Sequence, residues 1–427
     1  MTAVLILLCL ITPFVYVVSP YIFLVVLLLE AFLFVHKVSG IGNRFLLLLL
    51  LGVMFSCISV AGIRLYDLVI VATFIITWVK KRGHILVTPN IVPFLVLVIL
   101  VGIAHGGSEN LTETLRYIIC ILLFITTFNN EYNFEDIQST LMGIALANIY
   151  YAVAVFGLNT LGRIREYSGI VSSNIYVISS SSEVRLNGFF SDPNKYMAFC
   201  LALLFIVELW IQKGKFKNFL ILILCISSLI SLSRTAILSL LAYLFFKVIK
   251  VVYEKSKVLL IVLGSAIIIT IILLIVNPDV FSAGVNYLYV TSARLMGREH
   301  TLSINANMQS DNRTLIWKQA IGLIGERPIL GYGWNSIREL IPYPTHNTVL
   351  ELLLDSGIVG LVCYLILMRK LFFNKYYEYT IPFIWVPILL LDMGGYRVLF
   401  LLLGLVSVYA NSIIQDSYSQ ELTTDKI

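Results

Sequence analysis

Charged residues are scarce in this sequence. Asp, Glu, Lys and Arg together make up 13% of its 427 residues, whereas 59% are hydrophobic. Soluble domains carry about 25% charged residues, so this composition excludes a soluble enzyme. It predicts instead a polytopic membrane protein whose solvent is the lipid bilayer.

Cysteine and histidine are also few, at 6 and 5 residues. All the cysteines fall inside apolar runs, so the sequence indicates neither a disulfide framework nor a thiolate metal cluster. The histidines other than His346 show no ligand spacing, and Asp192, Asp279 and Asp311 form no recognisable metal cluster. We therefore predict an activity that needs no metal and no cofactor.

Apolar runs that can cross a hydrocarbon core fill most of the chain. Backbone inside a bilayer must be bonded within helices or closed barrels, and these runs lack the alternating polarity of barrel strands. We predict an all-α transmembrane helix bundle of about 14 spans, or about 12 or 13 because several runs are short. The predicted spans are 3–18, 21–35, 45–63, 66–79, 91–105, 115–128, 137–156, 188–210, 219–232, 235–252, 258–276, 348–368, 381–391 and 398–412.

Lys and Arg cluster in loops that this set of spans places on one side. The clusters lie within residues 80–82, 213–217, 247–257 and 369–375. Basic loops face the cytoplasm, so both termini are predicted to be cytoplasmic. The net charge of +6 follows from this bias and from contact with anionic lipid, so we predict no nucleic-acid partner.

A long polar segment interrupts the spans in the second half of the chain. We predict N-terminal spans at 1–158, central spans at 159–276, a large extracytoplasmic loop at 277–347, and C-terminal spans with a cytoplasmic tail at 348–427. Within the loop, 314–325 has the pattern of a short amphipathic helix, with Asn312 or Asp311 as its N-cap. Pro328 and Gly331 are predicted to end it, and we expect the helix to lie over the outer mouth of the bundle.

Four polar motifs stand at the predicted outer boundary of the membrane. They are residues 185–194 (RLNGFFSDPN), 231–235 (SLSRT), 312–314 (NRT) and 346–347 (HN). Arginine suits a diphosphate because its planar guanidinium donates two parallel charge-assisted hydrogen bonds and stays charged. We predict that Arg185, Arg234 and Arg313 bind a diphosphate.

His346 is the predicted catalytic base. An imidazole can take the proton of an attacking sugar hydroxyl near neutral pH, which is what transfer to an alcohol requires. Supporting roles are predicted for the polar residues Asn187, Asp192, Asn194, Asn347 and Glu351.

Each of these residues also has a purely structural alternative. A boundary arginine can snorkel to lipid head groups, Arg313 can decorate a solvated helix face, and His346 can bond to the backbone at a helix start. Glu351 and Asp355 lie four residues apart on one helical face, where they can form a buried polar seam that pairs with the arginines. We favour this structural role for the two acids.

At these same residues the sequence resembles the O-antigen polymerase and O-antigen ligase superfamily, the Wzy and WaaL group of bacterial polysaccharide enzymes. The resemblance rests on RLNGFFSDPNKYMAF, LSRTAIL, NRTLIWKQAIGLIGERPILGYGWNS and THNTVLELLLDSGIVGL, and on their order along the chain. These blocks cover residues 185–361, whereas the N-terminal third contributes hydropathy alone.

The resemblance implies a membrane glycosyltransferase of the GT-C type in the bacterial inner membrane, with its active site facing the exterior. Its donor would be an undecaprenyl-diphosphate-linked oligosaccharide. In the ligase branch, arginines matching Arg185, Arg234 and Arg313 would hold the diphosphate, and a histidine matching His346 would be the base or the group that orients the acceptor. The family needs neither nucleotide sugar nor metal.

The acceptor is what separates the functions that the resemblance allows. We favour an O-antigen or capsule polymerase, which uses another lipid-linked repeat unit as acceptor and has a chain-length regulator as a partner. The alternative is an O-antigen ligase, which transfers the glycan to lipid A core or to a protein. A lipid-linked glycan flippase is disfavoured, because transporters place charged residues at midplane depth and here they crowd the outer boundary.

Overall fold

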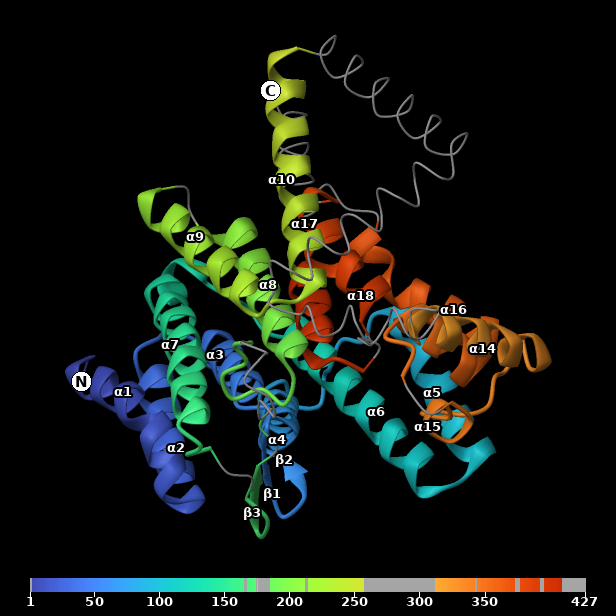
Figure 1. Ribbon diagram of the computed structural model, residues 1–427, viewed down its shortest axis with the longest axis horizontal. Coiled ribbons are helices and arrows are strands. Elements are labelled where there is room, and N and C mark those ends of the chain that lie inside the picture. The colour runs from blue at the N-terminus through green and yellow to red at the C-terminus, as the bar shows by residue number, and fades with distance from the viewer. Residues whose placement is uncertain are drawn as a thin grey trace.

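The computed structural model describes residues 2–164, 167–173, 175, 185–211, 214–256, 312–341, 344–372, 377–391 and 395–408, and it is mostly helical (Figure 1). Its first half contains α1 (Thr2–Val18), α2 (Pro20–His36), α3 (Ile41–Met54), α4 (Leu65–Lys80), η1 (Pro89–Ile91), α5 (Val92–His105), α6 (Ser108–Phe128) and α7 (Phe134–Thr160). Its second half contains α8 (Pro193–Trp210), α9 (Lys215–Ile230), α10 (Arg234–Lys255), α14 (Asn312–Glu326), α15 (Ile337–Leu340), α16 (Thr348–Phe372), α17 (Tyr377–Thr380), the π-helical η2 (Ile381–Trp385), α18 (Val386–Leu390) and a last helix, Arg397–Val408.

Several of these helices are suited to a membrane. Among the described residues, five are long and apolar enough to cross one, namely α6, α7, α8, α10 and α16, and six shorter apolar helices of 10–17 residues accompany them. This confirms a helical, multi-pass membrane protein. The predicted span 258–276 lies outside the described residues.

Local sequence explains where the helices begin. Pro20 and Pro193 occupy the first turn of α2 and α8, where a missing N–H costs nothing. Ser19 and Asp192 precede them as N-caps, and each accepts a hydrogen bond from a backbone amide in the first turn. The predicted span 188–210 therefore starts too early, because residues 188–192 form a turn before α8.

The predicted span 45–63 is wrong at its C-terminal end. Helix α3 ends at Met54, and the chain then forms β1 (Ile58–Val60) and β2 (Ile63–Arg64), which pair with β3 (Val171–Ser173) in an antiparallel sheet of order β2-β1-β3. Ala61 and Gly62 both have positive φ, +50° and +80°, as a two-residue hairpin turn requires. Among the residues that the structure describes, the bundle is therefore helical except for this small sheet.

The packing centres on α8. It contacts α3, α7, α9 and α10. In its most apolar stretch 83% of the helix is buried inside the protein, against 28% in α10. Figure 1 shows α8 in the middle of the bundle, with α7, α9 and α10 around it. Because α8 is enclosed by protein, its N-terminus is a fixed platform for the residues that precede it.

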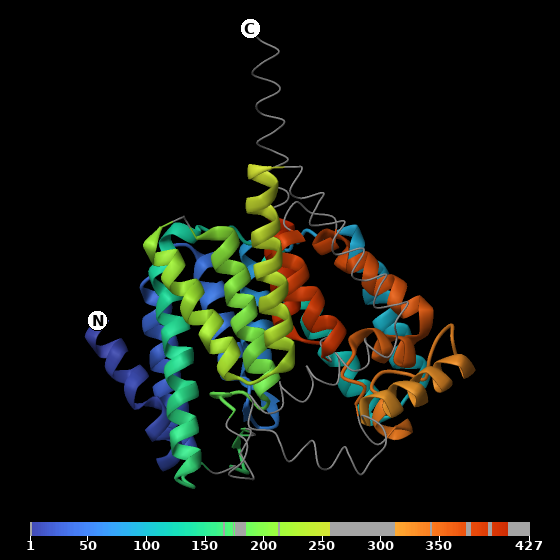
Figure 2. The same ribbon diagram turned by 45° about the horizontal axis from the view of Figure 1, so that its top comes forward.

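The sheet marks one end of the bundle, which we call the strand end. Figure 2 shows the strands at the lower end and the C-terminal end of α10 at the upper end. Cys57 N donates to Phe189 O at 3.3 Å, which ties the sheet to the start of α8. At the opposite end, Glu208 pairs with Lys217 and Lys247 at 3.2 and 3.0 Å, so these two lysines of the basic loops lie away from the strands.

Helix α16 is broken at Gly357, which has φ +64° and ψ −164°. The segment between α14 and α15 lies against the break: Tyr332 N donates to Leu354 O at 2.9 Å, and Ile358 N donates to Pro328 O at 2.8 Å. These contacts satisfy backbone groups that the break removes from the helical ladder. The break thus holds residues 328–333 in place.

We expect Gly357→Ala to destabilise the protein by more than about 2 kcal/mol. A Cβ there would lie 2.2 Å from Ile329 O, and φ is positive. Thermal unfolding of the detergent-solubilised protein measures the effect. Gly322→Ala is the matched control, because it adds its methyl group where nothing lies within 4 Å. Equal unfolding temperatures of the two variants would contradict the expectation.

Candidate functional site

The first two predicted motifs meet at the strand end. Arg185 donates from Nε to Ser231 O at 3.1 Å and from Nη2 to Asn194 Oδ1 at 3.3 Å. Ser233 donates from Oγ to the same Asn194 oxygen at 2.9 Å. A guanidinium and an amide therefore join the start of α8 to the turn between α9 and α10.

Arg234 is the first residue of α10 and follows this turn directly. Leu232 has φ +48°, which is uncommon for any residue with a Cβ and more so for a bulky one. The strained turn takes the chain from the end of α9 to the start of α10 within Ser231 to Ser233. Arg234 is half-buried there, so its position is set by the backbone on both sides.

The predicted supporting residues of the first motif shape its backbone. Asp192 Oδ1 accepts a hydrogen bond from Asn194 N at 2.6 Å, and the buried Asn187 donates from Nδ2 to Phe190 O at 2.9 Å. Gly188, at φ +53°, allows the chain to turn between them. The described contacts of Asn187 and Asp192 hold the turn that carries Arg185 and Asn194.

His346 lies in a second strained turn, immediately before α16. Its φ is +51°, and its side chain is half-buried. Asn347 caps α16, because its Oδ1 accepts from Val349 N at 3.0 Å and from Leu350 N at 3.1 Å. The Thr345 hydroxyl lies 3.0 Å from Glu351 Oε1. Polar contacts on both sides thus fix the backbone of His346.

Arg313 stands in the first turn of α14, and its side chain lies outside the described residues. The predicted helix at 314–325 corresponds to α14, Asn312–Glu326. One helical turn after Arg313, Trp317 donates from Nε1 to Thr345 O at 2.8 Å. This contact joins α14 to the turn of His346.

The two acids of the predicted polar seam are buried, whereas their pairing with the arginines stays a prediction. Glu351 and Asp355 are 8% and 7% exposed. Asp355 Oδ2 accepts from Asn335 N at 3.0 Å, and its Oδ1 accepts from Ser336 N at 3.1 Å. The described partners of both acids are hydroxyls and backbone amides, which supports a structural role.

Two further hydrogen bonds hold the start of α16 and the start of α8 to segments near the C-terminal helices. Thr348 donates from Oγ1 to Leu391 O at 2.8 Å, and Tyr396 donates from its hydroxyl to Lys195 O at 2.9 Å. Burial raises the pKa of Tyr396 well above its usual value, so the phenol stays protonated and able to donate. The segments of Arg185 and Arg234 are thus joined directly, whereas the meeting of His346 with these arginines stays a prediction.

A polar pocket of about 170 Å³ at the strand end contains residues that the sequence prediction missed. We call it the basic pocket. Its cations come from β2, α6, α8 and the last helix. The residues that line it are Val53, Ser56, Arg64, Tyr66, Glu113, Arg116, Ser191, Lys195, Gly395, Tyr396 and Arg397.

Ion pairs and an aromatic ring hold the deepest cation of the basic pocket. Arg397 is 5% exposed and donates to both oxygens of Asp67 at 3.1 Å. Its guanidinium lies 5.1 Å from the centroid of the Tyr66 ring. Arg116 pairs with Glu113. An ionisable residue beside an apolar run is by itself a signal of function, and that signal could have identified Arg116 and Arg397 from the sequence.

A family model described as O-antigen ligase matches residues 219–365. Residues 219–365 are therefore similar to an O-antigen ligase domain. This match confirms the predicted O-antigen ligase and polymerase superfamily. Within the O-antigen ligase domain lie Arg234, Arg313 and His346, whereas Arg185 and the four cations of the basic pocket lie outside it. No curated protein matches the sequence.

Proposed function

We propose that the protein is a polysaccharide polymerase. It transfers a glycan from undecaprenyl diphosphate to the sugar hydroxyl of another lipid-linked repeat unit, on the outer face of the bacterial inner membrane. One observation carries this proposal: the matched residues 219–365 contain Arg234, Arg313 and His346. In addition, Arg185 donates a hydrogen bond to Ser231 O, which lies within the same matched segment.

The arginines act on the leaving group. The bond that breaks joins the anomeric carbon of the donor sugar to a diphosphate oxygen, so negative charge develops on that oxygen. Arg185 and Arg234 are supported by Asn194 and by a strained turn, and such preorganised cations stabilise developing charge without rearranging during the reaction. Arg313 completes the clamp in this proposal.

His346 acts on the acceptor. A hydroxyl oxygen of the acceptor sugar forms the new bond to the anomeric carbon, and its proton passes to the imidazole. Undecaprenyl diphosphate leaves, and the imidazole then returns its proton to water. The backbone around His346 is fixed by Thr345 and Asn347, which suits a base that must meet a hydroxyl at one position.

The positions of two basic residues indicate which side of the membrane the site would face. Lys217 and Lys247 lie at the end opposite to the strands, and basic loops face the cytoplasm. The strand end would then face the exterior, where lipid-linked glycans are joined.

A ligase is the second candidate, because the matched family is described as O-antigen ligase. A ligase would use the same donor and the same arginines but would transfer the glycan to lipid A core or to a protein. The two reactions differ in the acceptor alone.

Purified protein in proteoliposomes, supplied with a lipid-linked repeat unit, tests the proposal. A polymerase produces a ladder of lipid-linked chains from the repeat unit alone. Product that forms only when lipid A core is added assigns a ligase instead. Glycan that crosses the bilayer without forming either product would overturn both and indicate a flippase.

A further inference from the structure

A polar cavity lies between the turn that joins α5 to α6 and the loop of residues 332–336. We call it the α6 cavity. Its volume of about 340 Å³ falls within the range of roughly 300 to 1,000 Å³ that is usual for small-molecule sites. A smaller cavity of about 150 Å³ shares Ser108, Glu109 and Asn335 with it, and also shares two lining residues with the basic pocket. The α6 cavity is therefore an extension of the strand-end site.

Three helices hold the loop that forms one wall of the α6 cavity. The buried Trp334 donates from its amide to Asn110 Oδ1 of α6 at 2.8 Å and from its indole to the backbone of α5 at 3.2 Å. Asp355 of α16 accepts from the amides of Asn335 and Ser336 at 3.0 and 3.1 Å. The wall is thus in place before any ligand arrives.

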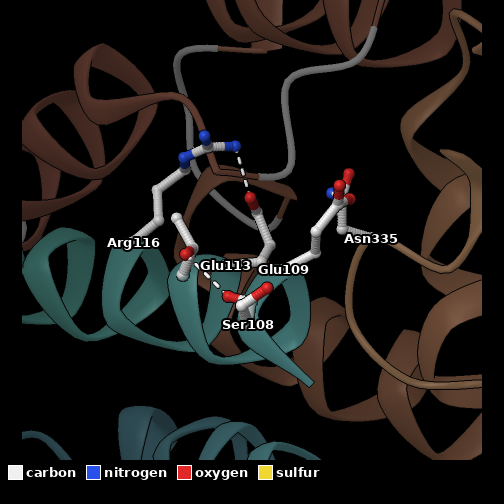
Figure 3. Close-up of a pocket in the computed structure, with 6 residues that line it drawn as sticks. Ser108, Glu109, Glu113, Arg116 and Asn335 are labelled. Carbon is white, nitrogen blue, oxygen red and sulfur yellow. Dashed lines mark hydrogen bonds and ion pairs between the residues drawn. The ribbon is translucent and has the colours of Figure 1, made fainter.

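Uncommon backbone conformations shape the same loop. Gly333 has φ +105°, and a Cβ there would lie 2.8 Å from His105 Cβ, so a side chain would push the loop away from α5. Asn335 has φ +63°, which is uncommon for a residue with a Cβ. Figure 3 shows its side chain beside Glu109, and its Nδ2 donates to Glu109 Oε2 at 2.9 Å. The loop therefore presents an amide and a carboxylate side by side.

The lining of the α6 cavity suits a neutral sugar. It includes two carboxylates, an amide, two aliphatic hydroxyls and an aromatic ring, which belong to Glu109, Glu339, Asn335, Ser108, Ser336 and Tyr332. Such polar groups bond in fixed directions, as sugar hydroxyls require, and the ring offers an apolar face. Among the described residues that line this cavity, none is a lysine or an arginine. An acidic sugar or a phosphate would find two carboxylates there and no cation.

Helix α16 links the α6 cavity to the turn of His346. His346 comes immediately before this helix, which begins at Thr348. Asp355, which holds the loop of the cavity, lies about two turns further on, or roughly 10 Å along the axis. One helix therefore carries the proposed base and supports the wall of the cavity, at a separation that a short oligosaccharide can span.

We propose that the α6 cavity binds a neutral sugar of the acceptor glycan, with its hydroxyls bonded to Glu109, Asn335 and Glu339. This inference rests on the proposed function, because it places the glycan whose hydroxyl meets the base. The two carboxylates repel an acidic sugar, and such repulsion contributes to specificity. The cavity then selects acceptors whose sugar at this position carries no acid group.

Binding of sugars that differ only in one charged group tests the proposal. The probes are methyl glucoside and methyl glucuronide, with the matching galactoside and galacturonide as a second pair. They are titrated into the full-length protein in nanodiscs and followed by saturation-transfer NMR. We expect at least one neutral glycoside to bind at least about tenfold more tightly than its uronide, because the uronide meets like charge.

Two variants remove the polar groups that Figure 3 shows side by side. Asn335→Gly removes the amide and keeps the positive φ, which glycine adopts readily. Glu109→Ala removes the carboxylate in the first turn of α6. Each should weaken binding of the neutral glycoside about tenfold, which is the order expected for hydrogen bonds that involve a charged group.

Glu131→Ala is the matched control, because it removes an exposed carboxylate beyond the other end of α6. It should leave the binding of every probe unchanged. Three results would overturn the proposal: no saturation transfer from the wild type to any neutral glycoside, equal binding of glycoside and uronide, or neutral binding that survives in the Asn335→Gly/Glu109→Ala double variant.

The transfer reaction is measured separately, with a lipid-linked repeat unit as donor and the lipid-free oligosaccharide as acceptor, each varied in turn. We expect Asn335→Gly to raise the KM for the acceptor about tenfold and to leave the KM for the donor unchanged. A rise confined to the donor would assign the cavity to the donor glycan and overturn the acceptor site.

The two measurements also separate this site from the proposed function. Transfer by a wild type that binds none of the glycosides refutes the sugar site and leaves the proposed function standing. Selective glycoside binding without any transfer has the opposite meaning, because the sugar site then exists in a protein of another activity.

Discussion

Arg234→Ala is expected to lower the rate of glycan transfer at least about a hundredfold. Arg234 follows the strained Leu232 turn and begins α10, so the backbone fixes its position. The proposed role is to stabilise charge on the departing diphosphate, so the loss should fall on the chemical step. Lipid-linked single repeat units should accumulate in cells that contain the variant at normal levels.

Arg234→Lys should recover little of this rate. Lysine keeps the charge but lacks the planar fork that bonds two phosphate oxygens at once. Arg369→Ala, an exposed arginine in the last turn of α16, is the matched control and should transfer normally. A normal ladder of chain lengths from Arg234→Ala on a polysaccharide gel would remove Arg234 from the site.

His346→Ala is expected to lower transfer by about 10² to 10⁴-fold, the usual contribution of a general base. Binding of the donor should be retained, because the arginines hold the diphosphate. Initial rates with a lipid-linked repeat unit, together with donor binding to the same protein, separate the two effects. A loss of donor binding would point to a role in the diphosphate clamp.

His346→Asn distinguishes the imidazole from the strained backbone. Asparagine adopts positive φ more readily than alanine, so this variant keeps the turn before α16 and loses only the base. We expect it to be as inactive as His346→Ala. Normal transfer by His346→Asn would show that another group removes the proton.

Each predicted motif within the described residues contains sequence signals that can be recognised without knowing the fold. Pro193 after Asp192 and Asn347 before a long apolar run mark helix starts, since caps and prolines act on their own turn. Apolar periodicity in the same way predicts α14 and the membrane helices. The apolar pattern gave a wrong prediction at 55–64, because the β-branched residues of β1 and β2 resemble the continuation of a membrane span. The pairing of β1 with β3, about 110 residues later in the chain, cannot be predicted from either segment alone.

The sequence by itself determined a helical membrane protein with arginines and a histidine beside its apolar runs. Hydropathy and helix caps are properties of neighbouring residues, so a single chain reveals them. Only the tertiary structure decided which of those side chains share a site. Arg397 and Asp67 are separated by 330 positions, and the basic pocket forms where β2, α6, α8 and the last helix converge. Such a convergence depends on how helices pack, and hydrophobic faces of similar composition do not specify their partners along the chain.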